Sequence, residues 1–531
     1  MTFGKKLRDL RESHTLSKKA LADRLGVSRQ TVCNWENGKT LPSLARLQAL
    51  AACFGAEPHV FFKNDVRNKE NPPKRCEKFF GTDGFRGEAN VELTPEYAYR
   101  IGRFLGWHYT KEKKKEGARA RIVIGKDTRR SSYMLEYALA AGVAASGADA
   151  YMLHVTTTPS VSYITKCDGF DCGVMITASH NQFTDNGIKL INRYGEKLED
   201  STTEKVEEYL ARTPAEIEHR FDIPRATGAE IGCISDYVAG RNRYMAYLIS
   251  LAAHSYKKLR IGLDTANGAA FMIARAVFSA LGAELTLIGD DPNGININEG
   301  CGSTHIEALC RLVREKHLDL GLAFDGDGDR CIAVDERGEV VDGDKILYIL
   351  ASRLKARDML SKNTVVATVM SNSGLDESLA AIGIDCERTA VGDRFVFECM
   401  QKKDLALGGE HSGHIILKKY ATTGDGLLTA IMLTEELCDS KSTLSKLAAP
   451  VKLYPQYTES VRVADKDAAA NDPLVLARLE EIQQELNTGG RILLRKSGTE
   501  PVLRVMVESE SEENSIRLAK SLIEVIKKTQ K

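Results

Sequence analysis

Short apolar runs that each end in a polar loop constrain the fold of this chain most. Residues 173–177 lead into Ala178 and Ser179, and residues 319–324 lead into three alternating aspartates. Such runs predict buried strands, and ligands of open α/β sheets bind where parallel strands end. The same pattern predicts further strands at residues 121–125, 259–264 and 364–369. Strand–loop–helix sections with different motifs indicate an α/β chain whose architecture repeats.

Ser179 lies at the end of the first of these runs, GVMITASHN. A serine there can carry a group covalently, although its hydroxyl is a weak nucleophile without help. The same pattern also fits a serine that caps a following helix. The polar tail up to Lys189 contains Asn186-Gly187, which predicts a turn. The carrier interpretation is favoured because other stretches supply what a phosphoserine would need.

Length and charge indicate several domains of different character. The 531 residues are too many for one hydrophobic core. The net charge is zero, but residues 1–75 hold 15 basic and 7 acidic side chains, a net of +8, and the remainder is net −8. The basic piece indicates a nucleic-acid partner. Twelve cysteines without a Cys-x-x-Cys pair fit a cytoplasmic protein, and no signal peptide or membrane span is expected.

The basic piece is predicted to form short helices. Gly26 is expected to end one helix, and Ser28 to cap the next. Two helices joined by a tight turn form a helix-turn-helix, whose second helix lies in the major groove of DNA. The expected DNA-facing residues are Ser28, Arg29, Gln30, Thr31 and Asn34. A small helical bundle used for protein contacts is the alternative.

The stretch LGVSRQTVCNWENGK with LPS after it resembles the Cro/CI-type helix-turn-helix family. Lys18 stands where that family often has glutamine, which keeps a phosphate contact but loses an amide. One such unit makes few base contacts, so specific DNA binding is expected to need a homodimer. The charged stretch that follows contains Pro72-Pro73 and is expected to be a linker.

Cations and carboxylates recur at the predicted loops of the large piece. Arg86 lies in FFGTDGFRG, and Lys126 and Arg129 follow the strand at 121–125. Guanidinium groups bind phosphates in forked geometry. The most specific motif is DGDGDR, in which Asp325, Asp327 and Asp329 alternate with glycines and precede Arg330. Three carboxylates suit Mg²⁺ with a phosphate oxygen as a further ligand.

An EF-hand loop is the rival interpretation of DGDGDR, because Glu336 has the spacing of its twelfth ligand. The sixth position is Arg330 rather than glycine, and the flanking residues are predicted to be strands. The sequence therefore argues against an EF-hand.

Two later loops carry sugar- and phosphate-binding chemistry. GGEHSGH contains Glu410 and Ser412, which suit vicinal sugar hydroxyls, and His414, a candidate acid or base that could equally be structural. The C-terminal stretch LRKSGTEPVLR offers amides, hydroxyls and arginines for a phosphate that is held rather than transferred. Its candidate residues are Arg495, Ser497, Gly498, Thr499 and Arg504.

Residues 79–526 resemble the α-D-phosphohexomutases and, among them, the bacterial phosphoglucosamine mutases. The resemblance rests on FGTDGFRG, GKDTR, TASHN with NGIK, DPNGININ, GSTH, DGDGDR, MSNSG, GEHSGH, TTGDG and RKSGTEP. It implies three mixed α/β domains of similar topology and a smaller C-terminal α+β domain, after the all-α helix-turn-helix domain. The expected bounds are 1–63, a linker at 64–76, then 77–232, 233–335, 336–450 and 451–531.

The resemblance implies a ping-pong reaction through a phosphoserine. Phosphorylated Ser179 donates to glucosamine 6-phosphate, glucosamine 1,6-bisphosphate turns over, and the other phosphate returns to the serine. One Mg²⁺ is bound by the three aspartates and the phosphate of Ser179. Lys189 resembles the general base, with His180, Arg86, Arg330 and His414 nearby. Glu410 and Ser412 hold the sugar, Lys126 and Arg129 contact the substrate, and the C-terminal loop holds the distal phosphate.

The chain departs from the mutase pattern in its fused basic module, and at Thr177 and His411. Three hypotheses therefore remain. The first is a mutase on the route to UDP-N-acetylglucosamine and peptidoglycan. The second is a mutase for mannose or glucose phosphates. The third is a DNA-binding regulator that uses the mutase body as a sugar-phosphate sensor.

Overall fold

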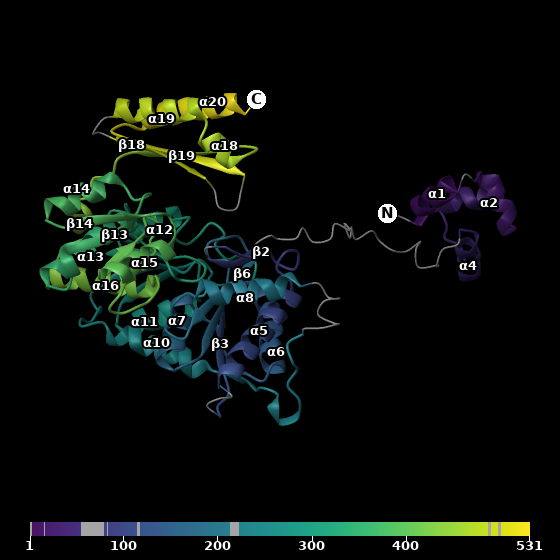
Figure 1. Cartoon of the computed structure of the whole chain (residues 1–531), viewed down its shortest axis with the longest axis horizontal. Helices are drawn as coiled ribbons and strands as arrows, with labels where there is room; N and C mark the ends of the chain where they lie inside the picture. The colour runs from purple at the N-terminus through teal and green to yellow at the C-terminus, as the bar shows by residue number, and fades with distance from the viewer. Residues whose placement is uncertain are drawn as a thin grey trace. The chain divides into compact units, whose positions relative to one another are not determined.

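The computed structural model divides into two compact units, Met1–Cys76 and Glu77–Lys531. It describes residues 3–14, 16–54, 79–81, 83–113, 117–212, 222–486, 490–496 and 501–530 (Figure 1). The linker expected at 64–76 lies outside the described residues. Within these ranges no helix has both the length and the apolar character needed to cross a membrane.

Short helices build the described part of the first unit, as the sequence predicts: α1 (Phe3–Ser13), α2 (Lys18–Leu25), α3 (Arg29–Glu36) and α4 (Leu44–Cys53). Ser17 and Ser28 cap α2 and α3, and Gly26 ends α2 at a left-handed φ of 60°. The helices share a core of Leu7, Leu21, Ala22, Leu25, Val32, Trp35, Leu47, Leu50, Ala51 and Phe54. The predicted helix-turn-helix is confirmed.

Glu36 is a buried acid inside this unit. Nε of Arg11 donates to its carboxylate at 2.6 Å, and Nζ of Lys18 lies 3.2 Å from the same group. Burial alone would raise the pKa of Glu36, but Arg11 and Lys18 hold it below its ordinary value. Lys18 therefore differs from the expected DNA contact, because its ammonium is paired with Glu36.

Replacing Glu36 by alanine is expected to destabilise the first unit by ~3 kcal/mol, because Arg11 would stay buried without its partner. Amide hydrogen exchange in α2 and α3 of the full chain should then become about 100-fold faster. Asp23→Ala, an exposed change on α2, is the control and should alter exchange only slightly. Unchanged exchange in Glu36→Ala would contradict this account.

The first sheet of the second unit has the order β1-β2-β6-β5-β3-β4-β7. β5 pairs with β3 in parallel and with β6 antiparallel. Helices α5 and α6 lie on one side of β3 and α7 on the other (Figure 1). This covering explains why β5 is apolar throughout. The elements are β1 (Phe80–Gly81), β2 (Gly84–Glu88), α5 (Pro95–Lys113), β3 (Arg121–Lys126), α6 (Arg130–Ala145), β4 (Asp149–Val155), α7 (Thr158–Cys167), β5 (Cys172–Ile176), β6 (Asp185–Asn192), α8 (Asp200–Ala211), η4 (Gly228–Glu230) and β7 (Ile234–Asp236).

The second sheet has the order β12-β11-β10-β8-β9, and the third β14-β13-β15-β16. The second comprises α10 (Val238–Ser250), β8 (Arg260–Asp264), α11 (Phe271–Ala280), β9 (Glu284–Ile288), α12 (Glu307–Lys316), β10 (Leu320–Phe324), β11 (Cys331–Val334) and β12 (Val340–Val341). The third comprises α13 (Gly343–Ala356), η5 (Ser361–Asn363), β13 (Thr364–Thr368), α14 (Ser373–Ala381), β14 (Asp385–Thr389), α15 (Asp393–Lys403), β15 (Leu407–Gly409), β16 (Ile415–Leu417), α16 (Gly426–Ser440) and α17 (Leu444–Ala448). One large buried core extends through both regions, and each region also has a smaller cluster of its own.

The same kind of strand–loop–strand connection recurs in all three sheets. In each, a strand with a parallel neighbour is followed by an antiparallel partner, as in β5–β6, β10–β11 and β15–β16. The connecting loops carry Ser179, the DGDGDR aspartates and Glu410. The predicted repeat is thus present, but these motif loops join strand to strand rather than strand to helix.

The C-terminal region is a small antiparallel sheet, β17-β19-β18, covered by helices α19 and α20 (Figure 1). It has a hydrophobic core of its own. Its elements are β17 (Gln456–Arg462), α18 (Lys466–Ala470), α19 (Pro473–Leu486), β18 (Gly490–Lys496), β19 (Val502–Ser509) and α20 (Glu512–Thr529). The predicted order of three mixed α/β regions and a smaller α+β region is confirmed.

Two strands differ from the expected domain bounds. β7 completes the first sheet although it follows the expected boundary at residue 232, and β12 completes the second although it follows residue 335. Both strands have only two or three residues. A segment this short shows no alternation that sequence reasoning could detect.

Candidate active site

Loops of the first and second sheets meet at Ser179. Its hydroxyl donates to Oδ2 of Asp325 at 2.6 Å and lies 3.5 Å from Nδ1 of His180. Ser179 is 1% exposed and has a left-handed φ of 52°, which is uncommon for a residue other than glycine. Its amide donates to Oγ1 of Thr177 at 2.9 Å. The loop continues directly into β6, so Ser179 does not cap a helix.

The turn predicted at Asn186-Gly187 is wrong, because both residues lie in β6. The buried Asn186 side chain donates to the hydroxyls of Ser131 and Ser132 at 2.9 and 3.0 Å. A Cβ at Gly187 would lie 2.4 Å from the carbonyl oxygen of Thr177. The pair therefore serves close packing beside the serine loop, which the dipeptide alone does not reveal.

Arg129 lies behind the serine loop rather than facing a substrate. Its Nη2 donates to the carbonyl oxygens of Ser179 and Asn181, each at 2.9 Å, and its Nε to Asp127 at 2.8 Å. Asn298 adds a second donor to the Ser179 carbonyl at 2.9 Å. Arg129 is fully buried. It differs from the expected substrate contact because its donors already hold the backbone at Ser179.

Lys126 also differs from the expected substrate contact. It is fully buried, its ammonium pairs with the buried Glu136, and it lies 3.3 Å from the centre of the Tyr133 ring. Burial lowers the pKa of Lys126 although Glu136 opposes the shift. Lys126 therefore links strand β3 to helix α6 inside the protein and does not face a ligand.

Asp325, Asp327 and Asp329 are all buried and offer carboxylate oxygens within 4.8 Å of one another. Burial, together with Asp329 and Asp327, holds the pKa of Asp325 well above its ordinary value. The Oδ1 atoms of Asp327 and Asp329 are buried and have no hydrogen-bond partner among the described residues. Buried carboxylates this crowded need a cation.

These donors fit Mg²⁺, which prefers carboxylate oxygens and keeps positions open for phosphate. The buried oxygens without a hydrogen-bond partner are where such an ion would be held. The EF-hand alternative fails on the structure, because the loop joins strands β10 and β11 rather than two helices. Glu336 is turned away and accepts from the hydroxyl of Ser445.

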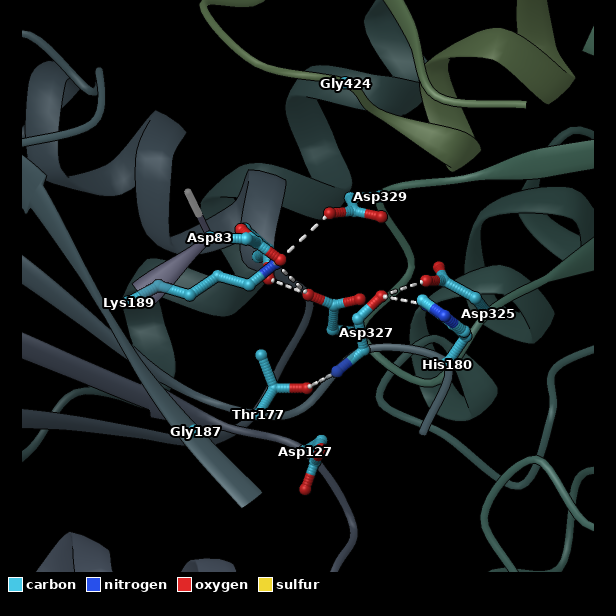
Figure 2. A network of polar contacts seen from close by, with 12 residues as sticks. Asp83, Asp127, Thr177, His180, Gly187, Lys189, Asp325, Asp327, Asp329 and Gly424 are labelled. Atoms are coloured by element: carbon cyan, nitrogen blue, oxygen red, sulfur yellow. Dashed lines mark hydrogen bonds and ion pairs between the residues drawn. The ribbon is translucent and has the colours of Figure 1, made fainter. Parts of the chain in front are cut away.

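Lys189 supplies positive charge among these acids (Figure 2). Its Nζ lies 2.9 Å from Asp327, 3.3 Å from Asp329 and 3.2 Å from Asp83. Burial alone would lower the pKa of Lys189, but Asp327, Asp83 and Asp329 raise it well above its ordinary value. The ammonium form is therefore stabilised, which opposes the general-base role that the resemblance implied.

Three further expected residues surround the serine loop. Burial and the cations Arg330 and Arg86 lower the pKa of His180 to about 4, so its imidazole is neutral at pH 7. Arg86 pairs with Asp83 and donates to Asn181 at 3.4 Å. The DGDGDR loop between β10 and β11 is called the metal loop from here on. The Arg330 guanidinium lies within 3.9 Å of two of its carboxylates, those of Asp325 and Asp329.

His414 is enclosed by protein groups. It is 4% exposed, and the amide of Gly424 donates to its Nε2 at 3.1 Å. Its Nδ1 lies 3.7 Å from Asp329. Burial lowers the pKa of His414 and the neighbouring Asp329 raises it, with Asp329 the stronger influence. The amide donor at Nε2 requires a lone pair there, so the ring carries its proton on Nδ1, on the side of Asp329. With both nitrogens turned to protein groups, His414 differs from the expected acid or base and supports Asp329.

The third motif loop places Glu410 and Ser412 beside His414. Oε1 of Glu410 accepts from the amide of Gly392 at 3.1 Å. The Ser412 hydroxyl is buried and has no hydrogen-bond partner in the part of the chain that the structure describes. A buried hydroxyl in that state suits a ligand hydroxyl.

Two arginines oppose each other in the C-terminal sheet. The register of β18 and β19 pairs Arg495 directly with Arg504, and like charges in this position repel. Burial and Arg504 lower the pKa of Arg495. A bound anion would relieve this repulsion. Ser497, Gly498 and Thr499, expected at the same site, lie outside the described residues.

Helix α3 presents the expected DNA-facing residues. Arg29 and Gln30 are exposed, and Thr31 and Asn34 are half-buried. Nε2 of Gln30 donates to Oδ1 of Asn34 at 3.1 Å, and the amide of Thr31 donates to Ser28 Oγ at 3.1 Å. Ser28 is thus occupied as the helix cap, while the Arg29 end of the face is open to solvent.

Sequence reasoning missed three residues that hold the site together. Asp83 pairs with Lys189, Asn298 holds the Ser179 carbonyl, and Thr158 donates to Asp327 at 2.6 Å. Asp83 and Asn298 lie in stretches that carried the family resemblance, which was the available signal. Nothing in the local sequence around Thr158 distinguished it.

Family comparisons cover both units. The descriptions "Phosphoglucomutase/phosphomannomutase, alpha/beta/alpha domain I", "domain II" and "domain III" match residues 77–216, 242–338 and 342–454, and the family's C-terminal domain matches 460–525. A helix-turn-helix family matches residues 7–61.

Curated relatives match most of the chain. A phosphoglucosamine mutase of Lachnospira eligens is 57% identical over 450 residues, covering 85% of this chain and 98% of the relative. One from Bacillus subtilis is 47% identical with the same coverage. A phosphoglucomutase/phosphomannomutase family protein of Burkholderia thailandensis has the same fold, with a TM-score of 0.69, 23% identity, and coverage of 85% of this chain and 97% of that chain.

Proposed function

The chain belongs to the phosphoglucosamine mutases of the phosphoglucomutase/phosphomannomutase family, and we propose that it interconverts glucosamine 6-phosphate and glucosamine 1-phosphate. The observation that carries this proposal is the 2.6 Å hydrogen bond from Ser179 to Asp325 inside a cluster of three buried aspartates. The product is a precursor on the route to UDP-N-acetylglucosamine. All the described cysteines are free, which supports action in a reducing compartment, the cytoplasm.

The proposed reaction moves a phosphoryl group out and back. In the first step the bond from phosphorus to Ser179 Oγ breaks, and a bond to a sugar hydroxyl oxygen forms. The hydroxyl proton is transferred to the serine oxygen, and glucosamine 1,6-bisphosphate results. This intermediate reorients and returns its other phosphoryl group to Ser179, which releases the isomeric monophosphate. No net proton or phosphate is consumed.

The chain's own residues mainly position groups and neutralise charge, which is what phosphoryl transfer requires. Lys189, Arg330 and Arg86 offset the negative charge of the phosphate and the aspartates. The neutral imidazole of His180 lies next to the serine oxygen and can hold a proton there. Bound by Asp325, Asp327, Asp329 and the serine phosphate, Mg²⁺ would stabilise charge on the transferring group.

We place the rest of the sugar phosphate on the third and fourth regions. Glu410 and the buried hydroxyl of Ser412 would hold sugar hydroxyls. Arg495 and Arg504, with Ser497, Gly498 and Thr499, would hold the phosphate that is not transferred. The paired arginines support this assignment because they place two positive charges side by side.

Arg495→Ala is expected to raise KM for the sugar phosphate about 30-fold, because a hydrogen bond to a charged group is worth ~2 kcal/mol. kcat should change less than about threefold, since the distal phosphate is held equally in ground and transition states. Steady-state kinetics would measure both. Arg462→Ala, an exposed arginine on the same sheet, is the control. Equal KM values for the two variants would contradict the assignment of Arg495 to the phosphate that is not transferred.

The substrate assignment is tested by a coupled assay with Mg²⁺ and a bisphosphate primer. Glucosamine 6-phosphate is compared with mannose and glucose 6-phosphates. Preference for the amino sugar supports the proposal, whereas preference for a hydroxyl sugar would favour a mutase for mannose or glucose phosphates. Failure to turn over any of them, with Ser179 shown to be phosphorylated, would favour a sugar-phosphate sensor.

We also propose that the first unit binds DNA as a homodimer. The net charge of +8 in residues 1–75 and the exposed Arg29 and Gln30 on α3 support this. Binding of the full chain to duplex DNA should weaken steeply with salt, and Arg29→Ala should weaken it by ~1–3 kcal/mol. Absent or salt-insensitive binding would instead favour a helical bundle that contacts protein.

A further inference from the structure

The first residue of helix α7 contacts the metal loop, although α7 packs on the first sheet and the metal loop joins two strands of the second. The amide of Thr158, its first residue, donates to the carbonyl oxygen of Asp327 at 2.9 Å. The Thr158 hydroxyl donates to Oδ2 of the same aspartate at 2.6 Å. Thr158 is 6% exposed and Asp327 fully buried. Two hydrogen bonds therefore fix one metal-loop residue from the neighbouring sheet.

The two carboxylate oxygens of Asp327 differ in their hydrogen bonds. Oδ2 accepts from Thr158 and, at 2.9 Å, from Lys189. Oδ1 is buried and has no hydrogen-bond donor among the residues that the structure describes. Turning the plane of the carboxylate away from this orientation would break both hydrogen bonds to the oxygen labelled Oδ2. The orientation seen here leaves Oδ1 for a cation.

We propose that Thr158 is a positioning residue that directs Oδ1 of Asp327 toward the bound divalent cation. This rests on the proposed metal site. Groups that hydrogen-bond to a ligand's second atom commonly set its orientation and the affinity of the metal.

Lys189 alone does not supply this orientation. Its Nζ is shared among Asp327, Asp329 and Asp83 at 2.9 to 3.3 Å, so it attracts all three carboxylates. Among the described residues, the Thr158 hydroxyl donates to Asp327, and the Thr158 amide anchors it to the same residue. Thr158 is the directional partner of the pair.

Helix capping does not account for the Thr158 hydroxyl. Thr157 is the N-cap of α7, and its side chain accepts from the amide of Ser160. Thr158 follows the cap and donates away from the helix, to Asp327. The helix end would therefore keep its cap if the Thr158 hydroxyl were removed.

The test measures Mn²⁺ binding to the full chain by the electron paramagnetic resonance signal of the free ion, without any assay of turnover. Thr158→Val keeps the shape of the side chain and removes the donor. It should weaken Mn²⁺ binding about 10- to 100-fold. Thr158→Ser restores the hydroxyl and should bind within about threefold of the wild type.

Thr165→Val is the matched control. Thr165 is buried on the same helix, and its hydroxyl donates to the carbonyl oxygen of Val161 at 2.7 Å. This change should leave Mn²⁺ binding unaltered. If Thr158→Val does not fold, Thr158→Ala carries the same expectation.

The outcomes separate this inference from the proposed metal site. Wild-type protein that does not bind Mn²⁺ would overturn the metal site and the inference with it. Wild-type binding combined with equally tight binding by Thr158→Val or Thr158→Ala would overturn the role of Thr158 alone. A supporting second readout is the Mg²⁺ concentration for half-maximal activity, which should rise in Thr158→Val and return toward the wild-type value in Thr158→Ser.

Discussion

Ser179→Ala is expected to lower kcat of the phosphoglucosamine mutase reaction by about 10⁴-fold or more, because the chain loses the atom that carries the phosphate. The Ser179 hydroxyl is placed for this role by its hydrogen bond to Asp325 and by the left-handed backbone that Arg129 and Asn298 support. The assay is steady-state turnover with a bisphosphate primer.

The substitution should leave the fold intact, so the thermal unfolding temperature of Ser179→Ala is expected to stay near that of the wild type. Ser352→Ala is the control, because Ser352 lies on α13 and its hydroxyl donates to the carbonyl oxygen of Tyr348 in the same helix. Full turnover by Ser179→Ala would refute the proposed carrier.

Asp327→Asn is expected to lower kcat about 10³-fold, equivalent to ~4 kcal/mol of transition-state stabilisation. Oδ1 of Asp327 would hold the cation while Oδ2 accepts from Thr158 and Lys189. An amide removes one negative charge and places a donor where an acceptor is needed. The measurement is turnover as a function of Mg²⁺ concentration.

Asp335→Asn separates this effect from a general loss of buried charge. Asp335 is 2% exposed, yet its carboxylate accepts from its own loop at Arg337 and Glu339. We expect activity within about threefold of the wild type. If Asp327→Asn kept both the activity and the Mg²⁺ dependence of the wild type, Asp327 would not be a metal ligand.

The sequence predicted the strands and the loops after them because their apolar runs and polar motifs are local. β5 was predicted at 173–177 and lies at Cys172–Ile176. β10 was predicted at 319–324 and lies at Leu320–Phe324. The helix-turn-helix was equally clear, because the caps at Ser28 and Gly26 are set by residues next to them.

What the sequence did not predict depends on partners far along the chain. Arg129 and Lys126 follow a strand as phosphate-binding cations do, but burial against Ser179 and Glu136 gives them other partners. Lys189 could be seen as a base only while the carboxylate of Asp83 was not known to lie 3.2 Å away. Burial and long-range pairing decide each case, and neither is visible in a local motif.

The loop architecture was partly predicted. The strand-end positions of Ser179 and Asp325 followed from the apolar runs before them. The strand β15 before Glu410 was not predicted, nor was the arrangement of the three loops on equivalent antiparallel connections. β16 and β12 have only three and two residues. Strands of that length are set by pairing with a neighbour rather than by propensity.

The most direct test of the account follows the phosphate on Ser179. The protein is treated with glucosamine 1,6-bisphosphate, and the peptide that contains residues 173–189 is analysed by mass spectrometry before and after addition of glucosamine 6-phosphate. The account predicts one phosphate on Ser179, which leaves at least as fast as turnover when the monophosphate is added. Turnover with Ser179 unphosphorylated throughout, or a phosphate that stays on Ser179 during turnover, would contradict it.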